Sequence, residues 1–335
     1  MNQKLLKIGF IGAGSIGSMF GGYLASIDTE EKPLEIIFFC IKDHRDAINR
    51  KGLELRTSNR DLLLTNIKAY ENAEEFAEAS GTERLYNFDY LFLTTKAYDI
   101  ERAMIQYKKL IEASSLLIIL QNGVGNEEIV AKNCDENKII RIITSHGALM
   151  ENFGIIRHTG IGFTKIGFTY LKPQSFNGDI YNKAFKKLLL ITELLEAGGL
   201  KTEIVDNVIK CSWEKAFVNI GINAIGAITR LNNGELLKNG SLKQYMDIAV
   251  MEALEVAKSK KIPLSDRDFF KLMYSVAEKT YHNKNSMLQD ILKGKPTEID
   301  FLNGKIVEFA NEQGLKAPIN ELLTNLVKGL ERSFN

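Results

Sequence analysis

The feature that most constrains the fold lies near the start of the chain and is the glycine pattern Gly12-Ala13-Gly14-Ser15-Ile16-Gly17. It follows an apolar, strand-like run at Lys7–Ile11 and opens a helical pattern at Ser15–Ile27. In that context the first glycine permits a tight turn, the second lets the backbone approach a pyrophosphate, and the third lets helix and strand pack closely. The helix N-terminus adds N–H groups and partial positive charge that attract phosphates. The motif therefore predicts a dinucleotide site, with an ordinary glycine-rich strand–helix turn as the alternative.

The first half of the chain alternates apolar runs with helical patterns, which is typical of a parallel sheet covered on both faces. The predicted strands are Lys7–Ile11, Glu35–Ile41, Tyr90–Thr94, Leu116–Leu120 and Ile139–Ser145. The predicted helices between them are Ser15–Ile27, Asp43–Lys51 and Ile100–Ile111. Two short runs flanked by glycine are expected to extend this sheet in antiparallel fashion, namely Ile155–His158 and Thr164–Phe168.

The second half carries helical spacing only, with Gly, Pro and Asn between the segments. The segments are Lys210–Arg230, Ser241–Lys258, Asp266–Lys284, Glu298–Glu312 and Ile319–Phe334. The change of pattern predicts an α/β domain over residues 1–205 and an all-helical domain over residues 206–335.

Charge and cysteine content exclude several classes of function. The net charge of +1, from 43 basic and 42 acidic residues, leaves no broad electrostatic footprint for a nucleic acid or an anionic membrane. Three scattered cysteines favour a reducing compartment, and the four histidines show no metal-ligand spacing. No apolar run reaches the ~18 residues of a membrane span. We therefore expect a cytoplasmic protein without a metal.

The choice between NAD and NADP depends on the end of the second predicted strand. An acid there would hold the ribose 2′-hydroxyl, whereas a cation would hold a 2′-phosphate. Lys42 comes first and Arg45 follows, which favours NADPH/NADP⁺. Asp43 lies between them and could instead cap the next helix. Both cations could also be ordinary solvated charges.

Two further strand ends carry polar residues, and ligands bind at this edge of open α/β sheets. Lys96 follows one strand, and Asn122 follows the next. Gly123 and Gly125 would keep the second loop open for close approach. We expect both side chains to face a ligand crevice, although a loop lysine is often only solvated.

Lys215, Asn219 and Asn223 recur every four residues in an otherwise apolar helix, so at about 100° per residue they form one stripe. A buried amide without a partner costs roughly 1–3 kcal/mol, so something must satisfy this stripe. Gly226 beside it would leave space. A groove lined by an ammonium and two amides suits a small carboxylate with an adjacent carbonyl. A hydrogen-bond network between helices is the alternative.

The remaining candidates lie in two loops further along. Ser286 alone would be an ordinary loop serine. Thr297 is expected to cap a helix, with Asp300 three residues on as an imperfect capping box. That role leaves Glu298, between them, unexplained beyond a helix-dipole preference.

Together these segments resemble the ketopantoate reductase (2-dehydropantoate 2-reductase) family along nearly the whole chain. The likeness is carried by GAGSIG, TTKA, QNGVGN, SHGALMENFGIIRHTG, WEKAFVNIGINAIGA, NSMLQD and PTEIDFLNG. It implies an NADPH-dependent reductase of a small 2-oxo acid, with a Rossmann-type N-terminal domain and a helical domain like that of 6-phosphogluconate dehydrogenase. The family makes pantoate on the route to pantothenate and coenzyme A.

The resemblance also implies roles for individual residues. Lys215 matches the family's general acid, and Glu298 its ligand for the substrate hydroxyl. Asn219, Asn223 and Ser286 match substrate-contacting positions, and Lys96 and Asn122 match the crevice lysine and asparagine. The family often has an arginine where this chain has Lys42.

Other functions remain open on sequence alone. The same scaffold could reduce another 2-oxo acid, as an opine or β-hydroxyacid dehydrogenase does. A non-catalytic NADP(H)-binding sensor is a further alternative, although such a protein would be expected to lack the lysine or the glutamate. No nucleic-acid or membrane partner is expected, and a homodimer is possible.

Overall fold

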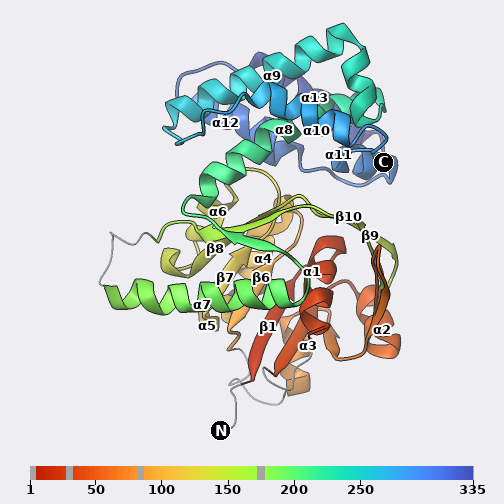
Figure 1. Ribbon diagram of the computed structural model, residues 1–335, viewed down its shortest axis with the longest axis vertical. Helices are drawn as coiled ribbons and strands as arrows, with labels where there is room; N and C mark the ends of the chain where they lie inside the picture. The colour runs from red at the N-terminus through yellow and green to blue at the C-terminus, as the bar shows by residue number, and fades with distance from the viewer. Residues whose placement is uncertain (1–4, 28–32, 81–86, 172–177, 335) are drawn as a thin grey trace. The chain divides into compact units, whose positions relative to one another are not determined.

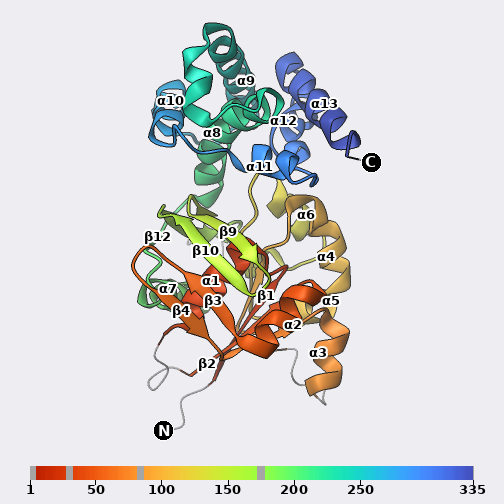
Figure 2. The same cartoon turned by 90° about the vertical axis from the view of Figure 1, so that its right-hand side faces the viewer.

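The computed structural model describes residues 5–27, 33–80, 87–171 and 178–334. By its internal contacts the chain divides into two compact units. The first consists of the described residues of Met1–Gln121 and Asn126–Val208. The second consists of Asn122–Gly125 and the described residues of Ile209–Asn335. Figures 1 and 2 show that the first unit is built on strands and the second on helices.

Within the described residues, the first unit is built on an eight-stranded sheet of order β12-β11-β8-β7-β6-β1-β2-β5. The strands are β1 (Leu6–Ile11), β2 (Leu34–Phe39), β5 (Ile67–Tyr70), β6 (Tyr90–Leu93), β7 (Leu116–Ile119), β8 (Ile139–Thr144), β11 (Thr164–Phe168) and β12 (Thr202–Ile204). From β5 to β8 every neighbouring pair is parallel. This is the doubly wound order of Rossmann folds, and the direction of winding reverses between β1 and β6.

Helices cover both faces of this sheet, as predicted. They are α1 (Ser15–Ala25), α2 (Lys42–Lys51), α3 (Ala73–Ser80), η2 (Ala97–Asp99), α4 (Ile100–Gln106), α5 (Lys108–Ala113), α6 (Asn126–Ala131), η3 (Glu136–Lys138) and α7 (Gly178–Ala197). Figure 2 shows α4 and α5 on the opposite side of the strands from α7. The expected helix Ile100–Ile111 is interrupted at Tyr107, which ends α4.

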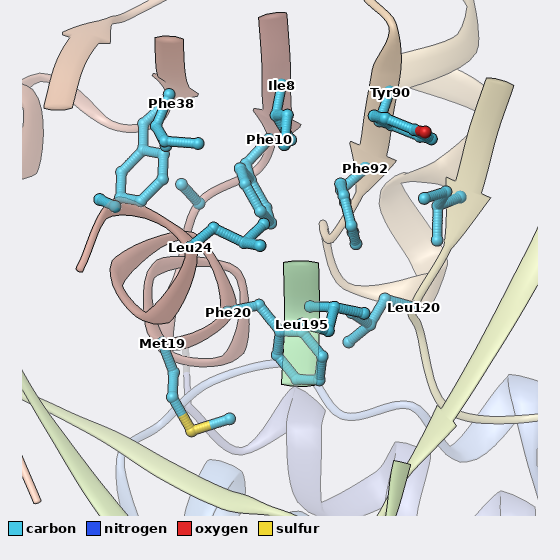
Figure 3. Close-up of a cluster of buried hydrophobic side chains, with 14 of the residues drawn as sticks. Ile8, Phe10, Met19, Phe20, Leu24, Phe38, Tyr90, Phe92, Leu120 and Leu195 are labelled. Atoms are coloured by element: carbon cyan, nitrogen blue, oxygen red, sulfur yellow. The ribbon is translucent and has the colours of Figure 1, made fainter. Parts of the chain in front are cut away.

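Alternate strand residues face the two helical layers. On one face Phe10 stacks on Phe92 with ring centroids 4.5 Å apart, and Phe20 and Leu24 of α1 pack nearby (Figure 3). On the other face Phe39 meets the ring of Tyr107 at 5.2 Å. Burial on both faces explains why these strands read as continuous apolar runs.

Of the two segments that were expected to extend the main sheet, only one joins it. β11 does so, pairing antiparallel with β8 in the register Thr164↔Thr144. The prediction for Ile155–His158 was wrong. Because β11 occupies that edge, β10 (Ile155–Gly160) pairs with β9 (Gly147–Asn152) and β3 (Leu53–Arg56), in a second sheet of order β4-β3-β10-β9 that also contains β4 (Asp61–Leu64). This sheet packs its β9 and β10 strands on α1.

The second unit contains helices only, within the described residues. They are α8 (Val208–Thr229), η4 (Asn233–Lys238), α9 (Gly240–Ser259), α10 (Phe269–Lys279), α11 (Ser286–Leu292), η5 (Ile299–Phe301), α12 (Asn303–Glu312) and α13 (Pro318–Arg332). The apolar helix α8 supplies Phe217, Ile220 and Ala224, all fully buried, to the core. The expected helix Glu298–Glu312 is split, because Leu302 (φ −116°, ψ −99°) separates η5 from α12.

Candidate functional site

The glycine turn has the conformation that its sequence predicts. Gly12 has φ +77°, and a Cβ there would lie 2.4 Å from Cγ2 of Thr95, so only glycine fits. A Cβ on Gly17 would lie 2.4 Å from Oγ1 of Thr94, which explains the close packing of α1. A Cβ on Gly14, in contrast, would meet nothing closer than 3.9 Å.

The N-terminus of α1 is shaped to receive an anion. Its N-cap is Gly14, which makes no side-chain cap hydrogen bond. Ala13 is buried, and Oγ of Ser15 accepts the backbone N–H of Met150 at 3.0 Å, so it does not cap the helix. The space beside Gly14 and the start of α1 at Ser15, which has no side-chain cap, fit the pyrophosphate of a dinucleotide.

Lys42 and Arg45 differ in their surroundings. Lys42 is the first residue of α2, is exposed, and forms no ion pair with a described residue. Arg45 donates to Oε1 of Glu75 at 2.7 Å and to Oδ1 of Asp46 at 2.8 Å. These hydrogen bonds raise the pKa of Arg45 above its ordinary range, and the bond with Glu75 contributes most. The alternative that Asp43 caps this helix is wrong, because α2 begins at Lys42 and its N-cap is Ile41.

Lys96 follows β6 at the point where the winding of the sheet reverses. Thr94, two residues earlier, donates through Oγ1 to the carbonyls of Ile11 and Gly12 at 3.0 and 2.9 Å. These bonds hold the end of β6 against the glycine turn. Lys96 is half-buried and caps η2. In open sheets of this kind the crevice at such a reversal is where ligands bind.

The loop after β7 belongs to the second unit by its contacts. Val124 is fully buried in the helical core, and its N–H donates to the carbonyl of Phe301 at 3.2 Å. Gly123 (φ +94°) has no room for a Cβ, which would lie 2.4 Å from that same carbonyl oxygen. The tight packing of this loop fixes the position of Asn122.

Asn122 links the two residues that the sequence singled out as catalytic. Nζ of Lys215 donates to Oδ1 of Asn122 at 2.6 Å. Nδ2 of Asn122 donates to Oε2 of Glu298 at 3.4 Å. Glu298 is 7 % exposed, so its carboxylate is held in a largely desolvated position.

A small hollow, partly open to solvent, lies at this point of the second unit. Its lining residues are Asn122, Asn219, Asn223, Ser286, Met287, Asp290, Glu298 and Leu302. Asn219 and Asn223 make no side-chain hydrogen bond to another described residue, although Asn223 is only 4 % exposed. The alternative of an interhelical network therefore does not account for the two amides.

Two expectations about the second unit need correction, one in helix α8 and one in the segment before α12. The recess beside Gly226 is filled, because a Cβ there would lie 2.3 Å from Nδ2 of Asn285. Thr297 accepts the N–H of Ile299 at 3.2 Å, but the N-cap of the helical turn is Glu298. Asp300 does not complete a capping box, since its carboxylate binds Lys328 at 2.9 Å.

Sequence reasoning did not single out Met287, Asp290 or Leu302 as lining residues. Met287 and Asp290 are three residues apart on α11 and so share a face with one another. Asp290 also follows the candidate Ser286 by four residues in α11, and this helical spacing is the signal that could have found it. Leu302 carries no polar group and had no such signal.

No group of three or more His, Cys, Asp or Glu suited to a metal ion occurs among the described residues. No helix in the described part of the chain is long and apolar enough to cross a membrane.

Comparisons with known proteins cover both units. The family described as "Ketopantoate reductase PanE/ApbA" matches residues 8–169, and "Ketopantoate reductase PanE/ApbA C terminal" matches residues 207–331. A curated relative from Pyrococcus horikoshii, named 2-dehydropantoate 2-reductase, is 35% identical over 97% of this chain and 98% of its own length.

Solved structures agree with this likeness. The crystal structure of a PanE/ApbA family ketopantoate reductase from Ralstonia eutropha is 26% identical, with a TM-score of 0.81, over 98% of this chain and 99% of that chain. The ternary structure of D-mandelate dehydrogenase with NADH and anilino(oxo)acetate is also 26% identical, with a TM-score of 0.83, over 98% of this chain and 100% of that chain. The matched glycine turn, the matched helical half and the relative that is 35% identical over almost the full length show that this chain belongs to the ketopantoate reductase family.

Proposed function

We propose that the protein reduces 2-dehydropantoate (ketopantoate) to (R)-pantoate with NADPH, in the biosynthesis of pantothenate and coenzyme A. The observation that carries this proposal is the hydrogen-bonded set Lys215, Asn122 and Glu298. Asn122 and Glu298 line the hollow of the second unit, and Lys215 is linked to them through Asn122. An ammonium, a carboxylate and unsatisfied amides suit a small molecule that has a carboxylate, a carbonyl and a hydroxyl. Family membership supports the same substrate.

Lys215 is proposed as the general acid. When bound, a reduced nicotinamide supplies the hydride for the carbonyl carbon of the oxo acid. Negative charge then builds on the carbonyl oxygen, and the Lys215 ammonium would stabilise this charge and donate a proton to it. The bond to Asn122 directs Nζ, since a 2.6 Å contact leaves the ammonium little freedom.

Glu298 and the polar side chains around it are proposed to grip the substrate. The buried carboxylate of Glu298 would accept a hydrogen bond from the substrate hydroxyl. The amides of Asn219 and Asn223, with the hydroxyl of Ser286, would hold the carboxylate and the carbonyl. Because these amides have no partner among the described residues, binding costs no protein hydrogen bond.

The cofactor is proposed to bind the first unit. Gly12, Ala13, Gly14, Ser15, Ile16 and Gly17 would hold its pyrophosphate. Lys42 would bind the 2′-phosphate, and Arg45, held by Glu75, would add its charge from a distance. Lys96 and Asn122 are proposed as further cofactor contacts. Residues 1–205 would then be the cofactor domain and residues 206–335 the substrate domain.

A second candidate is the reduction of another 2-oxo acid. Met287 and Leu302 give the hollow an apolar side that could accept a larger substituent. The structurally similar D-mandelate dehydrogenase was solved with an anilino(oxo)acetate. A cytoplasmic location, which three free cysteines favour, and a homodimer also remain proposals.

The deciding experiment follows NADPH oxidation by absorbance with ketopantoate, with aliphatic and aromatic 2-oxo acids, and again with NADH. We expect ketopantoate with NADPH to give the highest kcat/KM. Clear turnover of another oxo acid without turnover of ketopantoate would favour the second candidate. Cofactor binding without turnover of any acid would leave a nucleotide-binding protein.

A further inference from the structure

A buried histidine connects the glycine turn to the helix that carries Lys42. His44 lies in the first turn of α2 and is fully buried. Its Nε2 is 3.0 Å from Oγ of Ser18 in α1, and its Nδ1 accepts the backbone N–H of Gly154 at 2.9 Å. Oγ of Ser18 in turn donates to the carbonyl of Ala13 at 3.0 Å. Ser18 is fully buried as well.

The direction of each hydrogen bond in the series Gly154, His44, Ser18 and Ala13 follows from the backbone groups at the two ends of the series. The N–H of Gly154 can only donate, so Nδ1 of His44 must carry a lone pair. The proton of the neutral ring is then on Nε2 and donates to Ser18, whose own hydrogen is directed to Ala13. Burial lowers the pKa of His44 to about 4, so the ring is neutral near pH 7.

The two ends of this hydrogen-bond series, Ala13 and His44, lie at the parts of the first unit that would contact the cofactor. The carbonyl of Ala13 shares a peptide plane with the N–H of Gly14, the residue that caps α1. At the other end, His44 follows Lys42 by two residues in the same helical turn. Gly154 adds the turn between β9 and β10 as a third support. One imidazole therefore ties together three segments that are distant in sequence.

We propose that His44 is a positioning residue of the cofactor site. Through Ser18 it holds the glycine turn, and through α2 it holds Lys42, so that the distance between the pyrophosphate site and the 2′-phosphate site is fixed. This inference rests on the proposed function, because it assumes that NADPH binds there. NADPH binding should depend on His44 more strongly than NADH binding does, since NADH lacks the phosphate that would contact Lys42.

Two substitutions of His44 distinguish its hydrogen bond to Ser18 from its hydrogen bond to Gly154. In His44→Gln the amide nitrogen can reach the place of Nε2 and keep the bond to Ser18. In His44→Asn the amide oxygen can reach the place of Nδ1 and keep only the bond to Gly154. Both variants lose the ring and its packing, so a purely structural role predicts that they behave alike.

The measurement is the Kd of NADPH and of NADH, by fluorescence titration of the full-length protein, together with Tm. We expect His44→Asn to weaken NADPH binding about tenfold, as the loss of a buried hydrogen bond implies, and to weaken NADH binding less. His44→Gln should stay within about threefold of the unsubstituted protein. The KM for ketopantoate should be unchanged in both.

Ser18→Ala and Ser114→Ala provide a matched pair. Both serines are buried and donate to a backbone carbonyl, Ser18 to Ala13 at 3.0 Å and Ser114 to Ile111 at 2.8 Å. Only Ser18→Ala should weaken NADPH binding, while both should lower Tm. If His44→Asn does not fold, the difference in NADPH affinity between Ser18→Ala and Ser114→Ala tests the same hydrogen-bond series.

Equal NADPH affinity in all four variants, or losses that follow Tm alone, would overturn the positioning role and leave the proposed function intact. Absence of NADPH binding by the unsubstituted protein would overturn the proposed function, and this inference with it.

Discussion

Lys215 and Asn122 lie 93 positions apart in the chain, yet Nζ of the lysine donates to Oδ1 of the asparagine at 2.6 Å. The contact exists because Val124, two residues after Asn122, is buried in the core of the helical unit. Asn122, which follows a strand in the sequence, thus meets Lys215 within the helical unit. The orientation of the proposed acid is therefore set by a residue from outside its own helix.

Lys215→Ala should lower kcat by roughly 10²–10⁴, because it removes the group proposed to donate the proton. Steady-state kinetics with NADPH and ketopantoate measure this. Lys316→Ala removes an exposed lysine of the same unit and serves as control. Near-normal turnover by Lys215→Ala would exclude the lysine as the acid.

Glu298→Ala should raise the KM for ketopantoate about 10- to 100-fold and lower kcat, because a charged acceptor for the substrate hydroxyl is lost. The Kd of NADPH should not change. Asp300→Asn, two residues away, removes a carboxylate that is exposed and binds Lys328 at the surface. Such surface pairs contribute little, so this control should be near normal. Equal effects of the two substitutions would contradict the role of Glu298.

Lys42→Ala should weaken NADPH binding about 10-fold or more and leave NADH binding nearly unchanged, since only NADPH carries the 2′-phosphate. Lys51→Ala at the other end of α2 removes an equally exposed lysine and is the matched control. Titration of each variant with both cofactors gives the ratio of the two Kd values. A ratio unchanged by Lys42→Ala would remove this lysine from the cofactor site.

Gly14→Ala and Gly17→Ala should fail in different ways. The new Cβ at Gly14 meets open space, so Tm should hardly change while NADPH binding weakens, because the methyl group occupies the place of the pyrophosphate. The Cβ at Gly17 would lie 2.4 Å from Oγ1 of Thr94, so Tm should fall. Thermal unfolding and NADPH titration distinguish them. Unchanged binding by Gly14→Ala would argue against a pyrophosphate at this turn.

Acid should destabilise the fold through its buried histidines. Burial lowers the pKa of His44 and of His146 to about 4 in the folded protein, below the ordinary value of 6.5. Between these values the unfolded chain binds more protons, so the free energy of unfolding falls as pH drops from about 6.5 to 4. At about 1.4 kcal/mol per pKa unit, His44 accounts for at most about 3.5 kcal/mol of the loss.

Urea unfolding at several pH values measures this dependence. His44→Gln should be less stable at pH 7 but should lose less stability on acidification, because it has no proton to gain. A slope as steep as that of the unsubstituted protein would contradict the assignment to His44.

Local sequence determined most of the helices and strands and which polar groups share a face. Glycines at fixed spacing after an apolar strand predicted a tight strand–helix turn, and Gly12 and Gly17 have no room for a Cβ there. The four-residue recurrence of Lys215, Asn219 and Asn223 placed three polar groups on one helical face, because the period of a helix is known in advance.

Tertiary packing decided what local pattern could not. Whether Ile155–His158 joined the main sheet depended on which strand occupied the edge of β8, and that competition involves distant residues. Whether Arg45 met solvent or a carboxylate depended on Glu75, 30 residues away. The contact of Asn122 with Lys215 likewise required the loop Asn122–Gly125 to pack with the helices that follow much later in the chain. Strand pairing and side-chain contacts between residues far apart in the sequence are set by the packing of whole helices and strands. The periodicity of a local segment therefore does not predict them.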